Sequence, residues 1–353
     1  MIKKRDLMTR LNTEAVICAE GFLFEAERRG YMSCGEFVPE IALENPEALK
    51  NIHLDFQHAG SDVVLAFTYN GHREKMRVIN KEKLLEPLNR AALKIAKKIA
   101  ENTYDNEKNL MAGNISGTHI WDSNDENSKK EVRLMFREMI QWAKEEGADF
   151  IIGETFYYAE EAYVALEEIK KLGFDAVITI APMAENQMRE GISIIDTCKE
   201  LEQRGADVVG MNCFRGPSTM LPDLKKIRDV VKCHMAALPI CYRTNEKQPT
   251  FFNLKDNNNC SCPSPHGRAF PTALDPLYCN RYEINEFIKE AYKIGISYLG
   301  LCCGASPMLI REVANAINRK VPASRFNENM KNHFMYGTNE RIPNHSKKYG
   351  SYA

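Results

Sequence analysis

The 353-residue sequence contains no long apolar run and almost no net charge. No stretch approaches the roughly 18 consecutive apolar residues of a membrane-spanning helix, so we expect no membrane partner. The 47 Lys and Arg residues balance 48 Asp and Glu residues, which leaves a formal net charge of −1. A general nucleic-acid binder needs a basic face, so this balance argues against nucleic acid as a partner.

An export signal is also missing from the start of the sequence. The residues Met-Ile-Lys-Lys-Arg-Asp carry positive charge, but no apolar stretch follows them, so we expect a cytoplasmic protein. The eleven cysteines are then expected to be reduced thiols or metal ligands rather than a disulfide framework. These cysteines are the first candidates for a functional site.

Short apolar runs alternate with amphipathic segments along most of the chain. Most of the runs are rich in Val, Ile or Leu, which is typical of parallel strands that are buried on both faces. The eight expected strands lie at 15–18, 62–67, 110–115, 149–153, 176–181, 207–213, 238–242 and 297–303. Helical periodicity is found at 83–102, 128–146, 159–172, 191–205, 221–231, 282–294 and 307–318.

Several of the expected helices end in glycine, as a left-handed C-terminal turn requires. Eight strands that alternate with helices favour a (β/α)8 TIM barrel over a doubly wound sheet, and an open sheet split into two domains is the closest alternative. We expect one barrel domain at 1–320 and a C-terminal tail at 321–353. The tail is either an oligomerisation arm or a frayed end.

Two of the expected strands end in cysteine, with the sequences GMNC at 210–213 and GLCCG at 300–304. Barrel enzymes carry their chemistry at the carboxyl ends of the strands, so Cys213, Cys302 and Cys303 are expected to converge. Three cysteines with an open fourth position suit a catalytic zinc, whereas a structural zinc site closes with four ligands.

Adjacent cysteines in a strand point to opposite faces, so both bind one metal only where the strand ends and the backbone bends. Gly300 and Gly304 flank the pair and would permit that bend. Cysteine also packs well in protein cores, which is the role expected for the remaining eight. These are Cys18, Cys34, Cys198, Cys233, Cys241, Cys260, Cys262 and Cys279; the role of Cys260 and Cys262, in a loop-like stretch at 245–276, is left open.

The two cysteine segments resemble the zinc signature of the homocysteine S-methyltransferase family. The likeness runs from about residue 10 to 320 and favours the betaine–homocysteine branch of that family. It is carried by the segments at 20–24 (EGFLF), 28–31 (RRGY), 45–48 (NPEA), 67–69 (FTY), 152–154 (IGE), 160–162 (EEA) and 290–292 (EAY).

The resemblance implies a zinc-bound barrel that methylates homocysteine to methionine, as a dimer or tetramer. Cys213, Cys302 and Cys303 match the zinc ligands of the family, and Glu154 matches the acid that holds the homocysteine amino group. Thr68 matches a position in the same pocket. Glu20, followed by Gly21, takes the place of an Asp near the end of the first strand, displaced by one residue.

The donor side departs from the family pattern at several positions. Phe37 stands where the family has a Trp, Tyr69 where it has a Phe, and Asn70 and Thr155 where it has Tyr. Glycine betaine is the expected donor, with dimethylsulfoniopropionate and S-methylmethionine as alternatives. Folate-dependent relatives need additional modules for which 353 residues leave no room. A non-catalytic barrel that binds an onium compound is the alternative from a different functional class.

The expected chemistry needs a thiolate and a cage for a cation. A free thiol has a pKa near ~8.5, and zinc would hold the homocysteine sulfur as thiolate. A carboxylate at Glu154, after an apolar run, needs a cationic partner such as an ammonium, and Asn212 is placed to orient substrate. Aromatic faces bind onium cations; the donor-site candidates are Tyr31, Phe37, Tyr69, Asn70 and Trp121, with His72 and Arg73 as a site for a donor carboxylate or a solvated pair.

Overall fold

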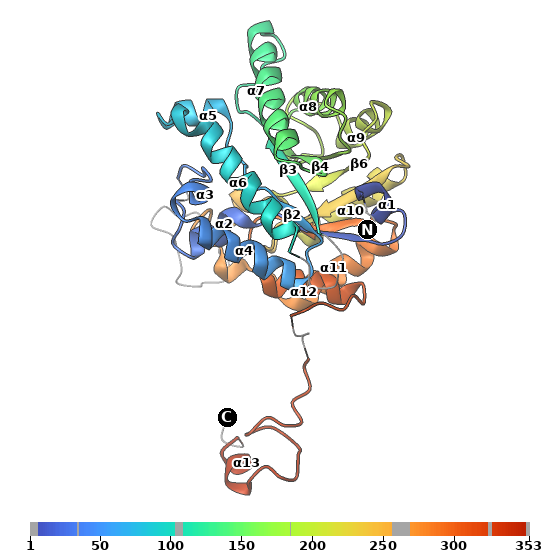
Figure 1. Ribbon diagram of the computed structural model, residues 1–353. Coiled ribbons are helices and arrows are strands. Elements are labelled where there is room, and N and C mark those ends of the chain that lie inside the picture. Colours follow the sequence, from blue (N-terminus) through green and yellow to red (C-terminus); the bar gives the residue numbers. More distant parts are fainter. Residues whose placement is uncertain are drawn as a thin grey trace. The chain divides into compact units, whose positions relative to one another are not determined.

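The computed structural model describes residues 6–33, 35–102, 109–183, 185–255, 269–323 and 327–350 (Figure 1). The chain divides into two compact units, Met1–Ala323 and Ser324–Ala353. Cys34, Cys260 and Cys262 lie outside the described residues.

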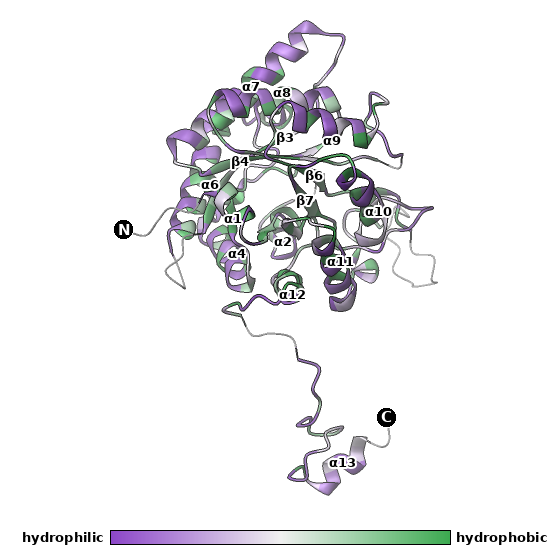
Figure 2. Ribbon diagram, turned by 90° about the vertical axis from the view of Figure 1, so that its right-hand side faces the viewer, coloured by the Kyte–Doolittle hydropathy of each residue, from purple (hydrophilic) through white to green (hydrophobic). Residues whose placement is uncertain are grey.

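The first unit is a closed barrel of eight parallel strands, which confirms the predicted (β/α)8 fold. Strands pair in sequence order, and β8 pairs with β1 through the register Val16↔Tyr298 to Ala19↔Leu301, which closes the sheet. Helices surround the strands, and Figure 2 shows hydrophobic strands inside a ring of helices with hydrophilic outer sides. The strands are β1 (Val16–Ala19), β2 (Val63–Leu65), β3 (Leu110–Ser116), β4 (Phe150–Phe156), β5 (Ala176–Ile180), β6 (Val208–Asn212), β7 (His234–Leu238) and β8 (Tyr298–Leu301).

All seven expected helices are present. Gly147, Gly173, Gly205 and Gly295 have φ between 82° and 93°, which is the left-handed conformation expected at helix ends. None of the described helices is long and apolar enough to cross a membrane. The barrel helices are α1 (Leu7–Leu11), α2 (Phe22–Arg28), α3 (Ile41–Glu44), α4 (Pro46–Ala59), α5 (Arg73–Val78), α6 (Leu85–Ala100), α7 (Glu126–Glu145), α8 (Ala159–Lys171), α9 (Ile194–Gln203), α10 (Pro217–Arg228), α11 (Arg281–Lys293) and α12 (Pro307–Ala316); α13 (Asn344–Gly350) belongs to the second unit.

The seventh strand lies earlier in the chain than predicted. The expected strand at 238–242 is wrong, and β7 instead spans His234–Leu238. Pro239 has no backbone N–H to donate to the sheet, so the ladder ends before it although the apolar run continues. Beyond Leu238, the last residue of β7, the buried apolar residues Ile240, Cys241 and Tyr242 lie outside the sheet, next to the cysteine segments.

Helix α4 was not among the expected helices, although its signals are present in the sequence. Pro46 occupies its first turn, and Gly60 follows its end with φ 116°. The buried residues Leu49, Ile52 and Phe56 have the spacing of one helical face. Helix α4 follows β1 and precedes β2 in the sequence, and it completes the alternation of strands and helices.

Candidate active site

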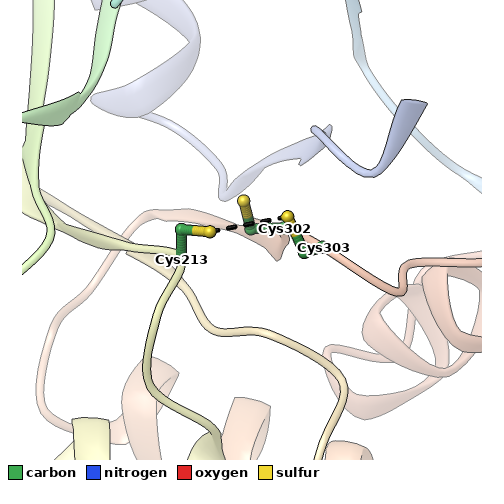
Figure 3. Close-up of side chains that lie close together, drawn as sticks. All are labelled: Cys213, Cys302 and Cys303. Atoms are coloured by element: carbon green, nitrogen blue, oxygen red, sulfur yellow. Dashed lines mark hydrogen bonds between the residues drawn. The ribbon is translucent and has the colours of Figure 1, made fainter. Parts of the chain in front are cut away.

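Three cysteine side chains converge at the carboxyl ends of β6 and β8. Figure 3 shows that the sulfur atoms of Cys213, Cys302 and Cys303 lie close together. The Sγ atoms of Cys213 and Cys303 are 3.5 Å apart, and all three sulfurs lie within 4.8 Å of one another. The structure therefore brings together the three residues that the sequence singled out as a metal-binding set.

The backbone turns sharply at both cysteine segments. Strand β6 ends at Asn212 and β8 at Leu301, so each cysteine lies just beyond its strand. Cys213 has φ 55° and Gly304 has φ 85°. The left-handed conformation costs a residue with a side chain roughly 1–2 kcal/mol, so the fold holds Cys213 in place against that cost.

Gly300 has a different role from the one predicted, because no positive φ is found there. A Cβ atom at Gly300 would lie 1.9 Å from the carbonyl oxygen of Cys18 on β1. Glycine is therefore needed for the close approach of β8 to β1, whereas the left-handed residue of the turn after the thiols is Gly304.

The segment after β7 ties the two cysteine turns together. The backbone N–H of Cys213 donates to the carbonyl of Leu238 at 3.0 Å, and that of Cys302 donates to the carbonyl of Pro239 at 2.9 Å. The N–H of Cys241 in turn donates to the carbonyl of Cys303 at 3.0 Å. This segment, which was expected to be a strand, sets the spacing between the cysteines of β6 and β8.

Two buried carboxylates lie beside the thiols. Oxygen atoms of Glu20 and Glu154 and the sulfur of Cys302 are within 4.8 Å of one another. The side-chain amide of Asn212 lies between the acids, with Nδ2 3.0 Å from Oε2 of Glu154 and 3.3 Å from Oε2 of Glu20. Its Nδ2 is also 2.8 Å from Oγ1 of Thr155 and 3.8 Å from the Cys302 sulfur. Asn212 thus links the acid pair to the thiol cluster.

Burial makes the ionised form of both acids costly. It raises the pKa of Glu154 to about 8, against the opposing hydrogen bond from Asn114. Burial and the neighbouring charge of Glu154 raise the pKa of Glu20 well above its usual range. Among the described residues, neither acid pairs with Lys, Arg or His, and Oε1 of Glu20 accepts no hydrogen bond. A ligand ammonium would supply the missing positive charge.

The thiols and acids line a cavity of about 370 Å³ with aromatic walls. The rings contact one another closely; the centroids of Phe251 and Phe252, for example, are 4.6 Å apart. The aromatic lining residues are Phe22, Phe24, Phe37, Phe67, Tyr69, Tyr157, Phe214, Phe251, Phe252 and Phe270. Such a cavity has the size of a small-ligand site, and its aromatic faces favour a cationic group.

Backbone strain is concentrated around this cavity. Eight described residues other than glycine have a positive φ, and two of these, Asn80 and Asn318, are not among the residues that line the cavity. Strained residues commonly cluster where a functional geometry is enforced by the rest of the fold. The other six all line the cavity: Phe37, Asn70, His119, Thr155, Cys213 and Phe214.

The predicted donor residues divide into two groups. Phe37, Tyr69 and Asn70 line the cavity. Tyr31 lies outside it, with 43% of its surface exposed just after the left-handed turn at Gly30, and Trp121 is buried away from the cavity lining. Neither of these two rings is therefore retained for the donor.

Thr68 and Gly21, two residues predicted for the homocysteine pocket, do not line the cavity but contact residues next to it. Thr68 donates through Oγ1 to the carbonyl of Asn114 at 2.8 Å, and Asn114 donates to Glu154 at 2.5 Å. A Cβ atom at Gly21 would lie 2.5 Å from Cβ of Ala305, so this glycine allows close packing against the Cys302 turn. His72 and Arg73 do not line the cavity either; His72 caps α5, and Arg73 pairs with Glu138.

Most of the aromatic wall is not predicted by the sequence pattern. Phe24 comes from α2, Tyr157 follows β4, and Phe251 and Phe252 belong to a short 3-10 helix in a long connection. Phe214 had the clearest available signal, because it directly follows Cys213. The others are separated along the chain, and no local pattern marks them as neighbours.

The donor atoms fit a zinc ion. Zinc–sulfur bonds of about 2.3 Å in a tetrahedral site place ligand sulfurs roughly 3.8 Å apart. The Cys213 and Cys303 sulfurs are 3.5 Å apart and all three lie within 4.8 Å, which is compatible with that spacing. Soft thiolate ligands favour zinc over Mg²⁺ or Ca²⁺. Cys213, Cys302 and Cys303 would hold the ion and leave one position open to the cavity.

Comparisons with known proteins agree with this geometry. A family model described as homocysteine S-methyltransferase matches residues 8–317. Betaine--homocysteine S-methyltransferase 1 of Danio rerio is 34% identical over 325 residues, covering 89% of this chain and 76% of that protein. The protein of the same name from Mus musculus is 31% identical, with 89% and 75% covered. S-methylmethionine--homocysteine S-methyltransferase BHMT2 of Pongo abelii is 28% identical, with 89% and 82% covered.

Solved structures show the same barrel at low sequence identity. The metallated form of the homocysteine methyltransferase MmuM from Escherichia coli superimposes with a TM-score of 0.66 at 15% identity, covering 86% of this chain and 96% of that chain. Its oxidised form also gives 0.66, at 16% identity, with 86% and 97% covered. These two structures support the fold alone.

Proposed function

Because the chain belongs to the homocysteine S-methyltransferase family and is an S-methyltransferase, we propose that it transfers a methyl group from glycine betaine to L-homocysteine in a zinc-dependent reaction. The products are methionine and dimethylglycine. The observation that carries this proposal is that three thiols and two buried acids, which have no cationic partner among the described residues, lie together on one aromatic cavity.

The acceptor half of the site is the part with thiols and acids. Zinc held by Cys213, Cys302 and Cys303 would bind the homocysteine sulfur as a thiolate, which is the nucleophile in methyl transfer. Glu154 and Glu20 accept the substrate ammonium, which compensates their buried charge. Asn212 orients both acids and keeps them beside the thiols.

The donor half is the aromatic part of the cavity. An onium donor enters with a fixed positive charge, and desolvated cation–π contacts contribute about 2 kcal/mol or more each. Phe37 and Tyr69 supply faces from the predicted set, and Phe214, Phe251 and Phe252 add further ones. The walls exclude water from the displacement, in which the donor loses its charge as the carbon–sulfur bond forms.

Other methyl donors fit the same chemistry. Dimethylsulfoniopropionate carries an onium group and a carboxylate like glycine betaine, and one relative is described as using S-methylmethionine. A barrel that binds an onium compound without turnover is the candidate from a different class. The departures at Phe37, Asn70 and Thr155 make the donor the feature most in need of measurement.

A donor panel tests the proposal. The zinc-loaded protein is given homocysteine with glycine betaine, dimethylsulfoniopropionate or S-methylmethionine, and methionine formation is followed. Glycine betaine is expected to give the highest kcat/KM, and metal-stripped protein should give none. A higher value with another donor would overturn the donor assignment, and no turnover with any donor would leave the non-catalytic barrel.

We also propose a cellular location and an oligomeric state for the protein. All eight described cysteines are free thiols, which suits a cytoplasmic protein. We further propose a homo-oligomer, a dimer or tetramer, in which residues 321–353 act as the assembly arm of a barrel domain at 1–320.

A further inference from the structure

One basic side chain lines the cavity with no acidic partner. Among the described lining residues, Lys75 is the only Lys or Arg. It lies on α5, where Arg73 pairs with Glu138 at 2.5 Å and Arg77 pairs with Glu74 at 2.7 Å. No described carboxylate forms an ion pair with Lys75, so its charge is available to a ligand in the cavity.

The position of Lys75 is set by the first turn of its helix. His72 caps α5, and its Nδ1 accepts a hydrogen bond from the backbone N–H of Lys75 at 3.3 Å. Burial lowers the pKa of His72 to about 3, so this ring stays a neutral acceptor near pH 7. Lys75 therefore enters the cavity from a fixed point of the backbone, with only its flexible side chain left to adjust.

A chain of polar groups lines the cavity near Lys75, since burial and the charge of Lys75 lower the pKa of His119, one of its members. Nδ2 of Asn70 donates to the carbonyl of Phe37 at 3.2 Å, and its Oδ1 is 3.3 Å from Nε2 of His119. The other ring nitrogen of His119 is hydrogen-bonded to the hydroxyl of Tyr157. No described residue accepts the second hydrogen of the Asn70 amide, so it is available to a ligand. Phe37, Asn70 and His119 all have a positive φ, so the fold enforces this arrangement.

A buried acid, Glu161, holds the loop that carries His119 through hydrogen bonds to the preceding residue. Oε1 of Glu161 accepts hydrogen bonds from N and Oγ1 of Thr118 at 2.8 and 2.6 Å. Glu161 itself is fully buried in the first turn of α8. His119 is thus held beside Asn70 by the structure beneath it, despite being partly exposed.

The charges in the cavity are therefore divided between two regions. Glu20 and Glu154, beside the thiols, are suited to an ammonium, and Lys75 with Asn70 is suited to an anion. We propose that Lys75 and the free N–H of Asn70 bind the carboxylate of the methyl donor, which makes Lys75 a specificity-determining residue for onium carboxylates. This inference rests on the methyltransfer function proposed above.

Donor discrimination tests the inference on the zinc-loaded full chain. Wild-type protein is compared with Lys75→Met, using glycine betaine and trimethylsulfonium, an onium donor without a carboxylate. We expect kcat/KM for glycine betaine to fall at least tenfold in Lys75→Met, mainly through KM, because a charge-assisted contact is lost. The values for trimethylsulfonium and the KM for homocysteine should stay within twofold.

Two control variants keep the result interpretable. Lys75→Arg retains the charge and should retain most of the preference, and Arg77→Met removes an outward charge from the same helix and should change neither donor. An equal loss with both donors, or no loss with glycine betaine, would overturn the inference.

A binding measurement separates this inference from the proposed function. Calorimetric titration with glycine betaine, in the presence of homocysteine, is run on wild type and Lys75→Met. Binding that depends on Lys75 without turnover would refute the methyltransfer function and leave the carboxylate site standing. If the wild type binds no glycine betaine, both the site and the donor assignment are wrong.

Discussion

At the scale of single residues, Asn212 is the junction of the site. Its one amide group lies within reach of both buried acids, the Thr155 hydroxyl and the Cys302 sulfur, and its Oδ1 accepts from Thr155 N and Thr179 Oγ1, each at 2.9 Å. Every polar atom of its side chain is therefore engaged. A buried amide in such a network fixes the acids relative to the thiols, because moving it would leave several buried groups without partners.

The thiol assignment is tested by a pair of cysteine variants. Cys302→Ser is expected to lose bound zinc and at least 99% of the activity, because a serine hydroxyl is a poor zinc ligand beside two thiolates. Cys233→Ser, in a half-buried thiol remote from the cavity lining, should lose neither. Zinc content by elemental analysis and methionine formation are measured together. A metal-replete, active Cys302→Ser protein would refute the assignment.

The acid assignment is tested at Glu154. Glu154→Gln removes the charge that we propose to hold the homocysteine ammonium, and hydrogen bonds to charged groups contribute about 1.5–3 kcal/mol. The KM for homocysteine should therefore rise about tenfold or more, while the KM for the donor changes little. Steady-state kinetics with one substrate varied at a time gives both values. Glu160→Gln, on the first turn of α8, is the matched control; an unchanged homocysteine KM in Glu154→Gln would exclude the role.

At the scale of elements, the packing of α7 on α8 depends on one buried carboxylate. Glu168 of α8 has 1% of its side chain exposed. It is 2.7 Å from Arg133 and 2.9 Å from Arg137, both on α7, and 2.9 Å from Lys171. The ion pairs of Glu168 with the two α7 arginines join the helices by charge as well as by apolar packing. Removing the acid would leave Arg137 and Lys171 without a carboxylate partner among the described residues, whereas Arg133 would keep Glu167.

The stability of this helix pair should depend on acidity. Burial alone would raise the pKa of Glu168, but Arg137, Lys171 and Arg133 outweigh it and lower the pKa from 4.5 to about 2. A depressed folded-state pKa stabilises the protein above the unfolded value and loses this contribution as pH falls from about 4.5 to 2. Glu168→Gln should therefore lower the free energy of unfolding by about 2 kcal/mol at pH 7.

The measurement is urea unfolding followed by circular dichroism at several pH values. The difference between wild type and Glu168→Gln should shrink as pH falls below 4.5. Glu167→Gln is the control, because that side chain is 39% exposed and surface pairs contribute less than about 1 kcal/mol. A difference that stays constant with pH would show that the charge of Glu168 does not carry the effect.

At the scale of the whole molecule, the hydrophobic core belongs to the barrel unit. The described buried apolar residues of the core run from Leu7 to Ala316, and all eight strands lie between these positions. Ala323 is the last residue of this unit, and its N–H donates to the carbonyl of His58 on α4 at 2.9 Å. A barrel that is closed by β8 on β1 needs no further segment to complete its sheet.

A truncation after Ala323 tests the two-part organisation. The shortened chain should keep its circular dichroism spectrum and a cooperative unfolding transition, because the sheet and the core are retained. If residues 321–353 form the assembly arm, light scattering should give an oligomer for the full chain and a monomer for the truncated chain. A full chain that is already monomeric, or a truncated chain that keeps its oligomeric state, would reject the arm.

Local patterns were enough to predict the barrel and the thiol cluster. The alternation of apolar runs with glycine-capped helices depends on neighbours a few residues apart, so it can be read without knowing the fold. The thiols follow from the same information, since Cys213, Cys302 and Cys303 sit where apolar runs end. The error at β7 arose where two local signals conflicted, because the apolar run continues beyond Pro239 while the proline stops the ladder.

The rest of the site was decided by tertiary structure. Glu20 and Asn212 are 192 positions apart in sequence, and only barrel closure brings their side chains to 3.3 Å. Phe24 and Phe251 become neighbours in the same way, with ring centroids 6.3 Å apart. Lys75, which has no ion-pair partner among the described residues, is likewise brought to the cavity by the fold. The sequence by itself determined the barrel and the thiol cluster, because strands, caps and strand ends are local. The aromatic wall, the acid pair and the Lys75 ammonium come from different helices, strands and loops, which only the closed barrel places around one cavity.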